Sequence, residues 1–529
     1  MSDPPVAAHY GRFYLTAAID YVNGDPHLGH AYEKVGCDAL ARHHRLQGAE
    51  VRFTVGSDEH SQSVERAARA EGLDPAAFCD RQVAVFQALF ERLDITYTNF
   101  VRTSGAANRR TTERLLSTVH ERGHIYKGMY AAWFCPSCEQ FYTEKELIDG
   151  HCPVHGSAVE WVEEENWFFR LSAFQEPLLR LFAEQPGFLT PGSRRNEMLN
   201  VIGAGLEDIS ISRGFTAWGF PLPFDPEQVA YVWFDALPAY ITGVGFAADD
   251  AEFARFWPAD VHVIGKDITR FHTIMWPAML MAAGIALPAR VHSHGFITLG
   301  GRKMSKSSGV RIDPATLVER FGSDAVRYVF LSEVPFDRDG DFSLETFVDR
   351  YNADLANDYG NLVSRTEKMT QRYRQARVPV PGPHTALDAD LEAVALRAVA
   401  EHAAAMDSID LSGAIAAAQR LVARANLYID ETKPWHMARE QDGRLDTVLH
   451  HLLEAIRVAT TLLHPFAPRA TRRVADDLGV ALDGRAGQAA RRFDVLVPGN
   501  PVGVGEILFP RLDRDRVLED WHRASRARH

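Results

Sequence analysis

His27-Leu28-Gly29-His30 follows an apolar, strand-like run at residues 13–18 and the turn Asn23-Gly24-Asp25-Pro26. In that turn the aspartate can cap a helix and the proline suits the first helical position, so we expect a helix to begin here. Both imidazoles then lie on one face of the first helical turn, where unpaired backbone N–H groups attract anions. The glycine between them leaves room for a nucleotide. The segment predicts a phosphate-binding helix start after a β-strand.

A second charged segment, Lys303-Met304-Ser305-Lys306-Ser307, lies far downstream. Glycines at 300, 301 and 309 bracket it, which favours a loop that closes over a polyphosphate and reopens. Taken alone, either segment is equally well explained by ordinary histidines or by a solvated turn. In this order the two resemble the paired signature of class I aminoacyl-tRNA synthetases. The resemblance implies an ATP site whose catalytic residues are His27, His30, Lys303 and Lys306.

Composition indicates a globular protein of several domains. The chain has 529 residues, 46% hydrophobic and 24% charged, which allows three or four domains with cores of their own. Its first ten residues do not resemble a signal peptide, and the apolar stretch 273–289 is broken by Pro277 and Gly284. We therefore expect a cytoplasmic protein without a membrane segment. A net charge of −13 argues against unselective coating of nucleic acid, although the basic run 362–377 allows local binding.

The apolar pattern predicts an α/β fold with a doubly wound parallel sheet. Two sets of strand-like runs are separated by a long insertion, and the strands are expected at residues 13–18, 51–56, 231–234, 261–264 and 291–298. Helices are expected at residues 26–47 and in an apolar stretch that ends near Ala283. The two sets are interpreted as halves of one Rossmann-type sheet.

The second half of the chain predicts a helix bundle. From about Tyr351 to Leu478 the sequence is helical and Ala-rich, with a Pro-rich interhelical stretch at 378–384. The tail ends in an apolar run at 507–510 that we expect to pack back onto the body. The expected division is 1–116 and 226–300 for the catalytic halves, 117–225 for the insertion, 301–350 for the Lys-rich loop and a short mixed segment, 351–478 for the bundle and 479–529 for the tail.

Three of the five cysteines cluster inside the insertion. Cys135-x-x-Cys138 and Cys152-x-x-His155 form two paired ligand turns with the spacing of a zinc knuckle. A redox Cys-x-x-Cys motif would need a thioredoxin-like context and would leave the second pair unexplained. We therefore expect structural zinc, because four protein ligands leave no position open for water. The other two cysteines, Cys37 and Cys79, are expected to be packed thiols.

Further motifs narrow the resemblance to the methionyl-tRNA synthetases, over nearly the whole chain. The segments that carry it are Tyr21-Val-Asn-Gly, Gly56-Ser-Asp58-Glu-His60, Asp208-Ile-Ser-Ile-Ser-Arg213, Tyr231-Val-Trp233-Phe-Asp-Ala236, Gly265-Lys266-Asp267, Phe271-His272 and Lys433-Pro-Trp435. The single knuckle resembles the one-knuckle branch of that family. The resemblance implies Mg²⁺ bound with ATP and nucleotide contacts from Asn23, Gly29, Gly265, Lys266, Asp267 and Ser305.

The same resemblance implies an amino-acid pocket for methionine. Its residues would be Ile19, Tyr21, Asp58, Trp233, Ala236, Tyr240, Ile268, Phe271 and His272, with Asp58 holding the substrate ammonium. A polarizable thioether packs well against ring edges, which suits the aromatic walls. Asp20 departs from the family pattern of proline or an aromatic residue, and Ser57 and Ser61 replace the usual Thr and Gly.

In the bundle, Asn361, Arg365 and Trp435 resemble the family's readers of the CAU anticodon. From the residues alone, Trp435 is more often a plug at the helix ends and Arg365 part of a solvated face. The resemblance implies a methionine–tRNA ligase that uses ATP, L-methionine and tRNA(Met). The family's frequent C-terminal extension is missing, which favours a monomer. The alternatives are a paralogue that activates an amino acid outside translation and a non-enzymatic RNA-binding protein.

Overall fold

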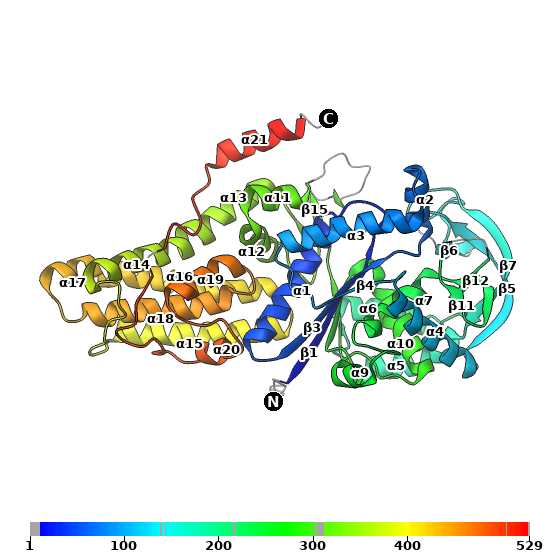
Figure 1. Cartoon of the computed structure of the whole chain (residues 1–529), viewed down its shortest axis with the longest axis horizontal. Coiled ribbons are helices and arrows are strands. Elements are labelled where there is room, and N and C mark those ends of the chain that lie inside the picture. Colours follow the sequence, from blue (N-terminus) through cyan, green and yellow to red (C-terminus); the bar gives the residue numbers. More distant parts are fainter. Residues whose placement is uncertain are drawn as a thin grey trace.

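The structure is a computed structural model, and it describes residues 11–137, 140–142, 144–214, 218–299, 302–303, 312–503 and 505–526. Figure 1 shows an elongated molecule, with an α/β part on the right and a helix bundle on the left. Helix α1 (Leu28–Leu46) lies where the two parts meet (Figure 1). None of the described helices is long and apolar enough to cross a membrane.

A parallel sheet of seven strands forms the centre of the α/β part. Its order is β2-β3-β1-β13-β14-β8, and β4 pairs with β3. The strands are β1 (Arg12–Ala17), β2 (Asp20–Tyr21), β3 (Glu50–Asp58), β4 (Asn99–Arg102), β8 (Leu189–Thr190), β13 (Val261–Gly265) and β14 (Val291–His294). The two sets of strands expected from the sequence therefore meet at β1 and β13, which confirms the doubly wound α/β fold.

Helices cover both faces of the sheet (Figure 1). They are α2 (Gln62–Ala70), α3 (Pro75–Arg92), α4 (Ala106–Glu121), α7 (Val232–Ala236), α8 (Ala239–Thr242), α9 (Asp250–Phe256) and α10 (Trp276–Ala283), which continues a π-helical turn, η4 (Phe271–Met275). The prediction of a strand at residues 231–234 is wrong, because β12 ends at Ala230 and these residues lead into α7. A run of four apolar residues is too short and too uniform for its periodicity to distinguish a strand from a buried helix.

The insertion forms a curved antiparallel sheet at the right edge of Figure 1. Its order is β6-β5-β7-β9, built from β5 (Ile125–Cys135), β6 (Gln140–Tyr142), β7 (Glu160–Phe169) and β9 (Ile209–Ser210). Helices α5 (Gln175–Glu184) and α6 (Gly192–Gly203) follow, and β10 (Ser212–Arg213), β11 (Pro221–Leu222) and β12 (Asp225–Ala230) form a small sheet. The insertion is less separate than expected, since β8 within it pairs with β14 of the central sheet.

The C-terminal half is helical, as expected. The segment that leads to the bundle holds β15 (Ile297–Leu299), β16 (Arg302–Lys303), α11 (Pro314–Phe321), α12 (Ser323–Glu333), β17 (Gly340–Asp341) and α13 (Leu344–Arg350). The bundle holds the π-helical η5 (Tyr351–Gly360), α14 (Asn361–Arg374), α15 (Ala386–Asp407), α16 (Leu411–Thr432), α17 (Pro434–Glu440), α18 (Leu445–Leu463) and α19 (Pro468–Asp477). The tail carries α20 (Ala486–Ala490) and α21 (Arg514–Arg526), and it packs back where Tyr351 donates a hydrogen bond to the Pro510 carbonyl (3.0 Å).

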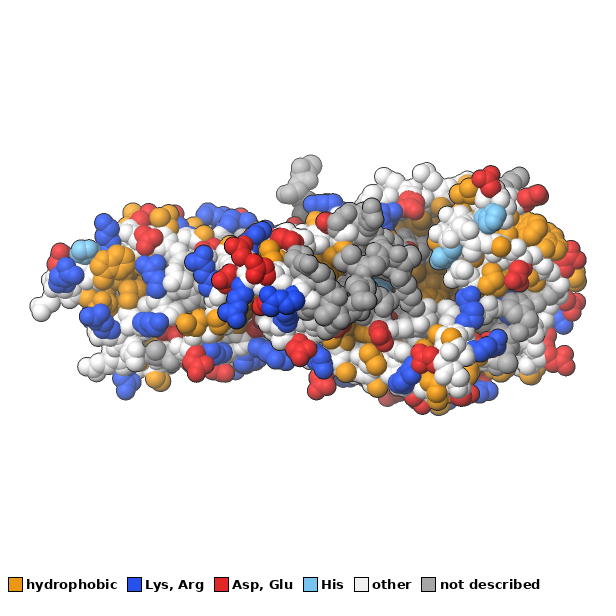
Figure 2. Space-filling model, turned by 90° about the horizontal axis from the view of Figure 1, so that it is seen from above, with side chains coloured by type: hydrophobic (Ala, Val, Ile, Leu, Met, Phe, Trp, Pro, Cys, Tyr) orange, Lys and Arg blue, Asp and Glu red, His pale blue; other side chains and the backbone are white. Residues whose placement is uncertain are grey.

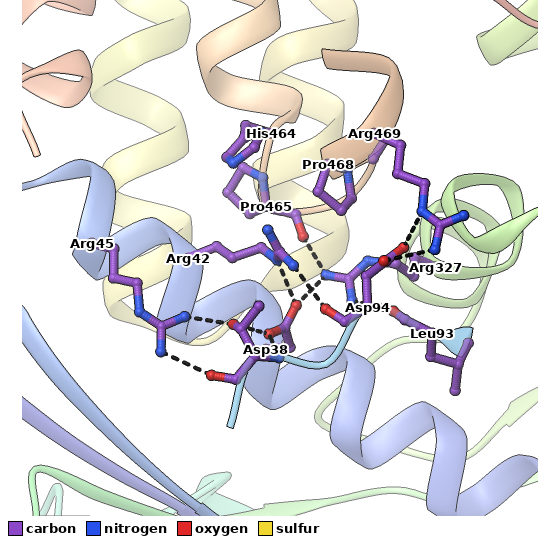
Figure 3. Close-up of polar contacts among 12 residues, drawn as sticks. Asp38, Arg42, Arg45, Leu93, Asp94, Arg327, His464, Pro465, Pro468 and Arg469 are labelled. Atoms are coloured by element: carbon purple, nitrogen blue, oxygen red, sulfur yellow. Dashed lines mark hydrogen bonds and ion pairs between the residues drawn. The ribbon is translucent and has the colours of Figure 1, made fainter. Parts of the chain in front are cut away.

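A buried ion pair joins the α/β part to the bundle (Figure 3). Asp38 of α1 lies 2.7 Å from Arg327 of α12, and both side chains are fully buried. Arg327 also donates to the carbonyls of Leu93 and Pro465, at 2.9 and 2.7 Å, so one guanidinium contacts three parts of the fold. Burial would raise the pKa of Asp38, but Arg327 and Arg42 outweigh it and hold the pKa at about 2. The ionised pair therefore contributes stability above pH ~4 that is lost as the pH falls through about 2.

Replacing Arg327 with methionine should destabilise the whole protein. The change leaves the buried Asp38 carboxylate with one ion-pair partner, Arg42, and with its hydrogen bonds from Thr96, and breaking a buried pair in this way costs roughly 3 to 5 kcal/mol. Arg469→Ala is the matched control, because Arg469 also pairs with an aspartate, Asp94, but its side chain is 64% exposed. We expect that control to lose less than about 1 kcal/mol. Urea unfolding of both variants measures the difference, and equal losses would contradict the importance of the buried pair.

Candidate active site

A cavity of about 560 Å³ opens at the carboxyl edge of the central strands. Figure 2 shows a hollow with hydrophobic walls near the middle of the molecule. The cavity is lined by fourteen of the residues that the sequence assigned to ATP or to methionine, from strands β2, β3 and β13, helices α1, α7 and α8, and the turns beside them. They are Ile19, Tyr21, Asn23, His27, Gly29, His30, Asp58, Trp233, Ala236, Tyr240, Gly265, Asp267, Ile268 and His272.

The first turn of α1 presents two stacked imidazoles to this cavity. His27, and not Asp25, is the N-cap of the helix, and its Nδ1 accepts a hydrogen bond from Gly29 N at 3.1 Å. His30 Nδ1 accepts one from His27 N at 3.1 Å, and the two rings lie 3.7 Å apart at 14°. The sequence expectation for the cap was wrong because a reciprocal pair of histidines replaces the usual aspartate. A Cβ at Gly29 would lie 3.0 Å from the His27 ring, so a larger residue would disturb this stack.

Burial keeps His30 neutral. It lowers the pKa of His30 well below its usual range, and the neighbouring His27 and Lys34 lower that pKa further. Since Nδ1 accepts a hydrogen bond, the proton of the neutral ring resides on Nε2. The cavity is therefore offered the Nε2–H of His30 at the positive end of helix α1, which is a suitable arrangement for phosphate oxygens.

Aromatic side chains form the apolar end of the cavity. Phe271 stacks on Trp233 at 3.9 Å and 8°, and Tyr21 meets Trp233 edge-on at 6.5 Å. Phe271 is absent from the cavity lining and supports Trp233 from behind. Asp58 ends strand β3 in register with Tyr21, so a nearly fully buried carboxylate lies beside this aromatic group.

Tyr240 and His272 form a hydrogen-bonded pair in the wall. His272 Nδ1 lies 2.9 Å from the Ile268 carbonyl, which accepts its proton, and His272 Nε2 then accepts from Tyr240 Oη at 2.7 Å. Burial lowers the pKa of His272 to about 4 and raises that of Tyr240, so both are neutral near pH 7. This fixed direction of the hydrogen bonds orients both rings toward the cavity.

The remaining predicted nucleotide contacts are Lys266 and the Lys-rich loop. Lys266 does not line the cavity; its ammonium is 2.6 Å from Asp339 and lies over the Phe296 ring. Lys303 of the Lys-rich loop lies in β16, and its backbone pairs with that of Thr298 in β15. The Lys303 side chain and the whole of Ser305 and Lys306 lie outside the described residues. Their contribution to the site stays a prediction.

Several cavity residues escaped the sequence reasoning. Glu33 and His294 are hydrogen-bonded to each other at 2.9 Å, and both line the cavity together with Asp20, Tyr32 and Phe296. Glu33 lies in the second turn of α1, and His294 is the last residue of β14. A signal for His294 existed, since polar residues at the carboxyl ends of parallel strands gather at one edge.

The knuckle residues approach one another in the insertion. The ligand atoms of Cys135, Cys152 and His155 lie within 4.8 Å of one another, with both cysteines buried and the histidine exposed. Cys152 Sγ lies 3.9 Å from His155 Nδ1, a separation that suits two ligands of one tetrahedral ion. Cys138, the fourth expected ligand, lies outside the described residues.

The end of the bundle brings together two of the three expected anticodon residues. The Arg365 guanidinium lies 6.0 Å from the centre of the Trp435 ring, which is 36% exposed at the start of α17. Asn361 is exposed one helical turn before Arg365 on α14. Figure 2 shows Lys and Arg side chains spread over the bundle around a hydrophobic patch near its end.

Comparison with known proteins identifies the family. Residues 13–160 and 144–367 match the family described as tRNA synthetases class I (M), and residues 378–528 match the anticodon binding domain of methionyl tRNA ligase. A methionine–tRNA ligase of Caldanaerobacter subterraneus is 46% identical over 96% of this chain and 80% of its own. The chain belongs to the methionyl-tRNA synthetase family.

Other members of the methionyl-tRNA synthetase family agree in length and fold. The methionine–tRNA ligase of Thermosynechococcus vestitus is 42% identical over 95% of this chain and 98% of its own. The structure of the Mycobacterium tuberculosis methionyl-tRNA synthetase in complex with methionyl-adenylate superimposes with a TM-score of 0.91, at 40% identity, over 95% of this chain and all of that one. The class I synthetase fold therefore extends over nearly the whole chain.

Proposed function

We propose that the cavity binds ATP and L-methionine together and that the end of the bundle reads the anticodon of tRNA(Met). The chain is a methionine–tRNA ligase, which activates methionine and charges tRNA. The observation that carries the proposal is the cavity itself. One end of the cavity offers the Nε2–H of His30 at the start of α1, and the other end is aromatic beside the Asp58 carboxylate.

The reaction has two steps, and neither needs a protein nucleophile. The methionine carboxylate attacks the α-phosphorus of ATP, which enters with its Mg²⁺, and pyrophosphate leaves as methionyl-adenylate forms. A ribose hydroxyl of the terminal tRNA adenosine then attacks the methionyl carbonyl, and AMP leaves. Catalysis is positional and electrostatic, because the protein has to align the reactants and to stabilise the charge that develops on the phosphate.

At the phosphate end, we assign this stabilisation to His27, His30, Lys303 and Lys306. The support for the histidines is their position on the first turn of α1, inside the cavity. Asn23, Gly29, Gly265 and Asp267 line the same cavity and are assigned to the nucleotide. For Lys303, Ser305 and Lys306 the support is the sequence motif alone. The ion pair of Lys266 with Asp339 makes a direct nucleotide contact a weaker assignment for that residue.

At the other end, the cavity suits the amino acid. Trp233 presents a flat ring that Phe271 holds in place, and a thioether packs favourably on such a surface. Asp58 is assigned to the methionine ammonium, because a carboxylate at the end of β3 compensates the positive charge of the bound substrate. Ile19, Tyr21, Ala236, Tyr240, Ile268 and His272 complete the proposed pocket.

For the insertion we propose one structural zinc ion. The donors of Cys135, Cys152 and His155 are close enough to share an ion, and Cys138 is the proposed fourth ligand. The two buried cysteines pack against Tyr142, Trp133 and Leu147 in a cluster that is too small to be stable without a further link. The zinc would thus hold the end of β5 to the turn at residues 152–155 that precedes β7, and it has no part in the chemistry.

Cys152→Ser should remove most of the bound zinc and loosen the insertion. We expect about one zinc per wild-type chain by elemental analysis and a clear loss in the variant, with methionine activation retained, because the knuckle supplies no residue to the cavity. Cys79→Ser is the matched control, since Cys79 is a buried thiol of α3 outside the knuckle. Wild-type protein that is metal-free and fully stable would refute the zinc site.

For anticodon recognition we propose Asn361, Arg365 and Trp435. Arg365 and Trp435 are partly exposed and lie against each other, so a guanidinium and a ring are offered to the same unstacked bases. Figure 1 shows α17 at the far end of the bundle from the central sheet. Reading the anticodon there is therefore separate from adenylate formation in the cavity.

Trp435→Ala should weaken tRNA charging and leave methionine-dependent ATP–pyrophosphate exchange unchanged. Loss of one stacked base costs roughly 1 to 3 kcal/mol, which would appear in kcat/KM for tRNA. Leu396→Ala is the matched control, because Leu396 is an equally exposed apolar residue of the bundle, on α15.

Measurement of both activities on each preparation decides between the explanations. Equal loss of charging and exchange in Trp435→Ala would mean that the tryptophan is structural. Unchanged charging would contradict the assignment and would favour a paralogue that does not read an anticodon.

We further infer that the chain acts as a monomer in the cytoplasm, where tRNA charging serves translation.

A further inference from the structure

A buried ammonium lies directly behind the phosphate end of the cavity. Lys34 Nζ is 2.7 Å from Asp20 Oδ1, 2.7 Å from Glu33 Oε1 and 2.8 Å from the Ala18 carbonyl, and its side chain is fully buried. These three acceptors use all three N–H donors of the ammonium. Lys34 does not line the cavity, whereas Asp20 and Glu33 do.

The two carboxylates differ in what else they contact. Glu33 accepts a second hydrogen bond, from His294 Nε2 at 2.9 Å. Asp20 is 6% exposed, and its Oδ2 has no hydrogen-bond partner among the described residues. Apart from Lys34, the only basic group that the described structure places within 4.0 Å of the Asp20 carboxylate is His30, while the negative charge of Glu33 raises the pKa of Asp20. Asp20 therefore depends on Lys34 for its position far more than Glu33 does.

His30 lies just beyond hydrogen-bond reach of Asp20. The separation of His30 Nε2 from Asp20 Oδ1 is 4.0 Å, about 1 Å too long for an N–H···O bond. His30 Nδ1 is already occupied by the His27 backbone, so Nε2–H is the proton that the ring has to offer. A small rotation of the Asp20 side chain would bring a carboxylate oxygen onto this proton.

We propose that Lys34 is a positioning residue for adenylate formation, which holds the Asp20 carboxylate away from His30 so that the Nε2–H of His30 stays available to ATP. The inference rests on the proposed role of His30 at the phosphate. Lys34 and His30 are four residues apart on one face of α1, so the ammonium and the imidazole compete for the same carboxylate from adjacent turns. The burial that raises the pKa of Asp20 to about 7 is opposed by Lys34, which agrees with the ammonium being its main partner.

The test is a comparison of single and double variants by methionine-dependent ATP–pyrophosphate exchange. Lys34→Met should lower kcat on the order of 100-fold, the loss typical of one missing donor to the transition state, with KM for methionine nearly unchanged. Asp20→Ala should lose far less activity than Lys34→Met. The double variant Asp20→Ala/Lys34→Met should recover most of the rate, since the carboxylate 4.0 Å from His30 is then gone and Glu33 is still bonded to His294.

Asp20→Glu provides an independent measurement that keeps the ion pair and the fold. Its longer side chain carries a carboxylate closer to His30 while Lys34 remains, so kcat should fall below that of Asp20→Ala. This comparison stands even where Lys34→Met does not fold, which thermal unfolding would reveal.

Three outcomes would overturn the inference. They are a double variant no faster than Lys34→Met, an Asp20→Ala variant as slow as Lys34→Met, and equal rates for Asp20→Glu and Asp20→Ala. Each would mean that Lys34 acts independently of Asp20. Wild-type protein without methionine-dependent exchange would instead overturn the proposed function, and the inference with it.

Discussion

The buried contact between Asp38 and Arg327 is the constraint on which the rest of the structure depends. Helix α1 starts at the cavity with His27 and is anchored near its middle by Asp38, which Arg327 ties to α12 and to the carbonyl before α19 (Figure 3). Because a helix is rigid over this length, the position of its first turn follows from where its middle is held. The same guanidinium also fixes the bundle, so the two parts share one anchor.

This anchor explains how one chain combines two distant tasks. The cavity needs a helix start at a fixed distance from the ends of β3 and β13, because transition-state stabilisation is sensitive to small displacements. The bundle needs a fixed orientation, because in the proposed function its exposed arginine and tryptophan meet an RNA whose other end reaches the cavity. A single buried cation with three partners satisfies both demands at the junction.

The elements with strong periodicity could be predicted from the sequence. Strands β1, β3, β13 and β14, helix α1 and the bundle were all expected, as were most residues of the cavity. The misassigned segment, α7, is short and uniformly apolar, so its pattern does not distinguish helix from strand. The pairing of β8 with β14 joins residues about a hundred positions apart, which no local pattern encodes.

The polar contacts behind the cavity were beyond prediction for the same reason. Lys34 meets Asp20 across 14 residues and Glu33 meets His294 across 261, and both contacts exist only because the sheet brings β1, β14 and α1 together. Asp20 was noticed as a departure from the family, yet its partner could not be named without the fold. Local motifs thus identified many of the groups that line the cavity, while the polar groups packed behind them required the structure.

The central claim is that one cavity binds ATP and methionine for adenylate formation, and amino-acid-dependent ATP–pyrophosphate exchange tests it most directly. The measurement is made on the whole protein without tRNA, with each of the twenty amino acids in turn. The account predicts rapid exchange with methionine and far slower exchange with the other nineteen, since only a thioether of that length fills the aromatic end while its ammonium reaches Asp58. Exchange that is absent with methionine, or faster with another amino acid, would contradict it.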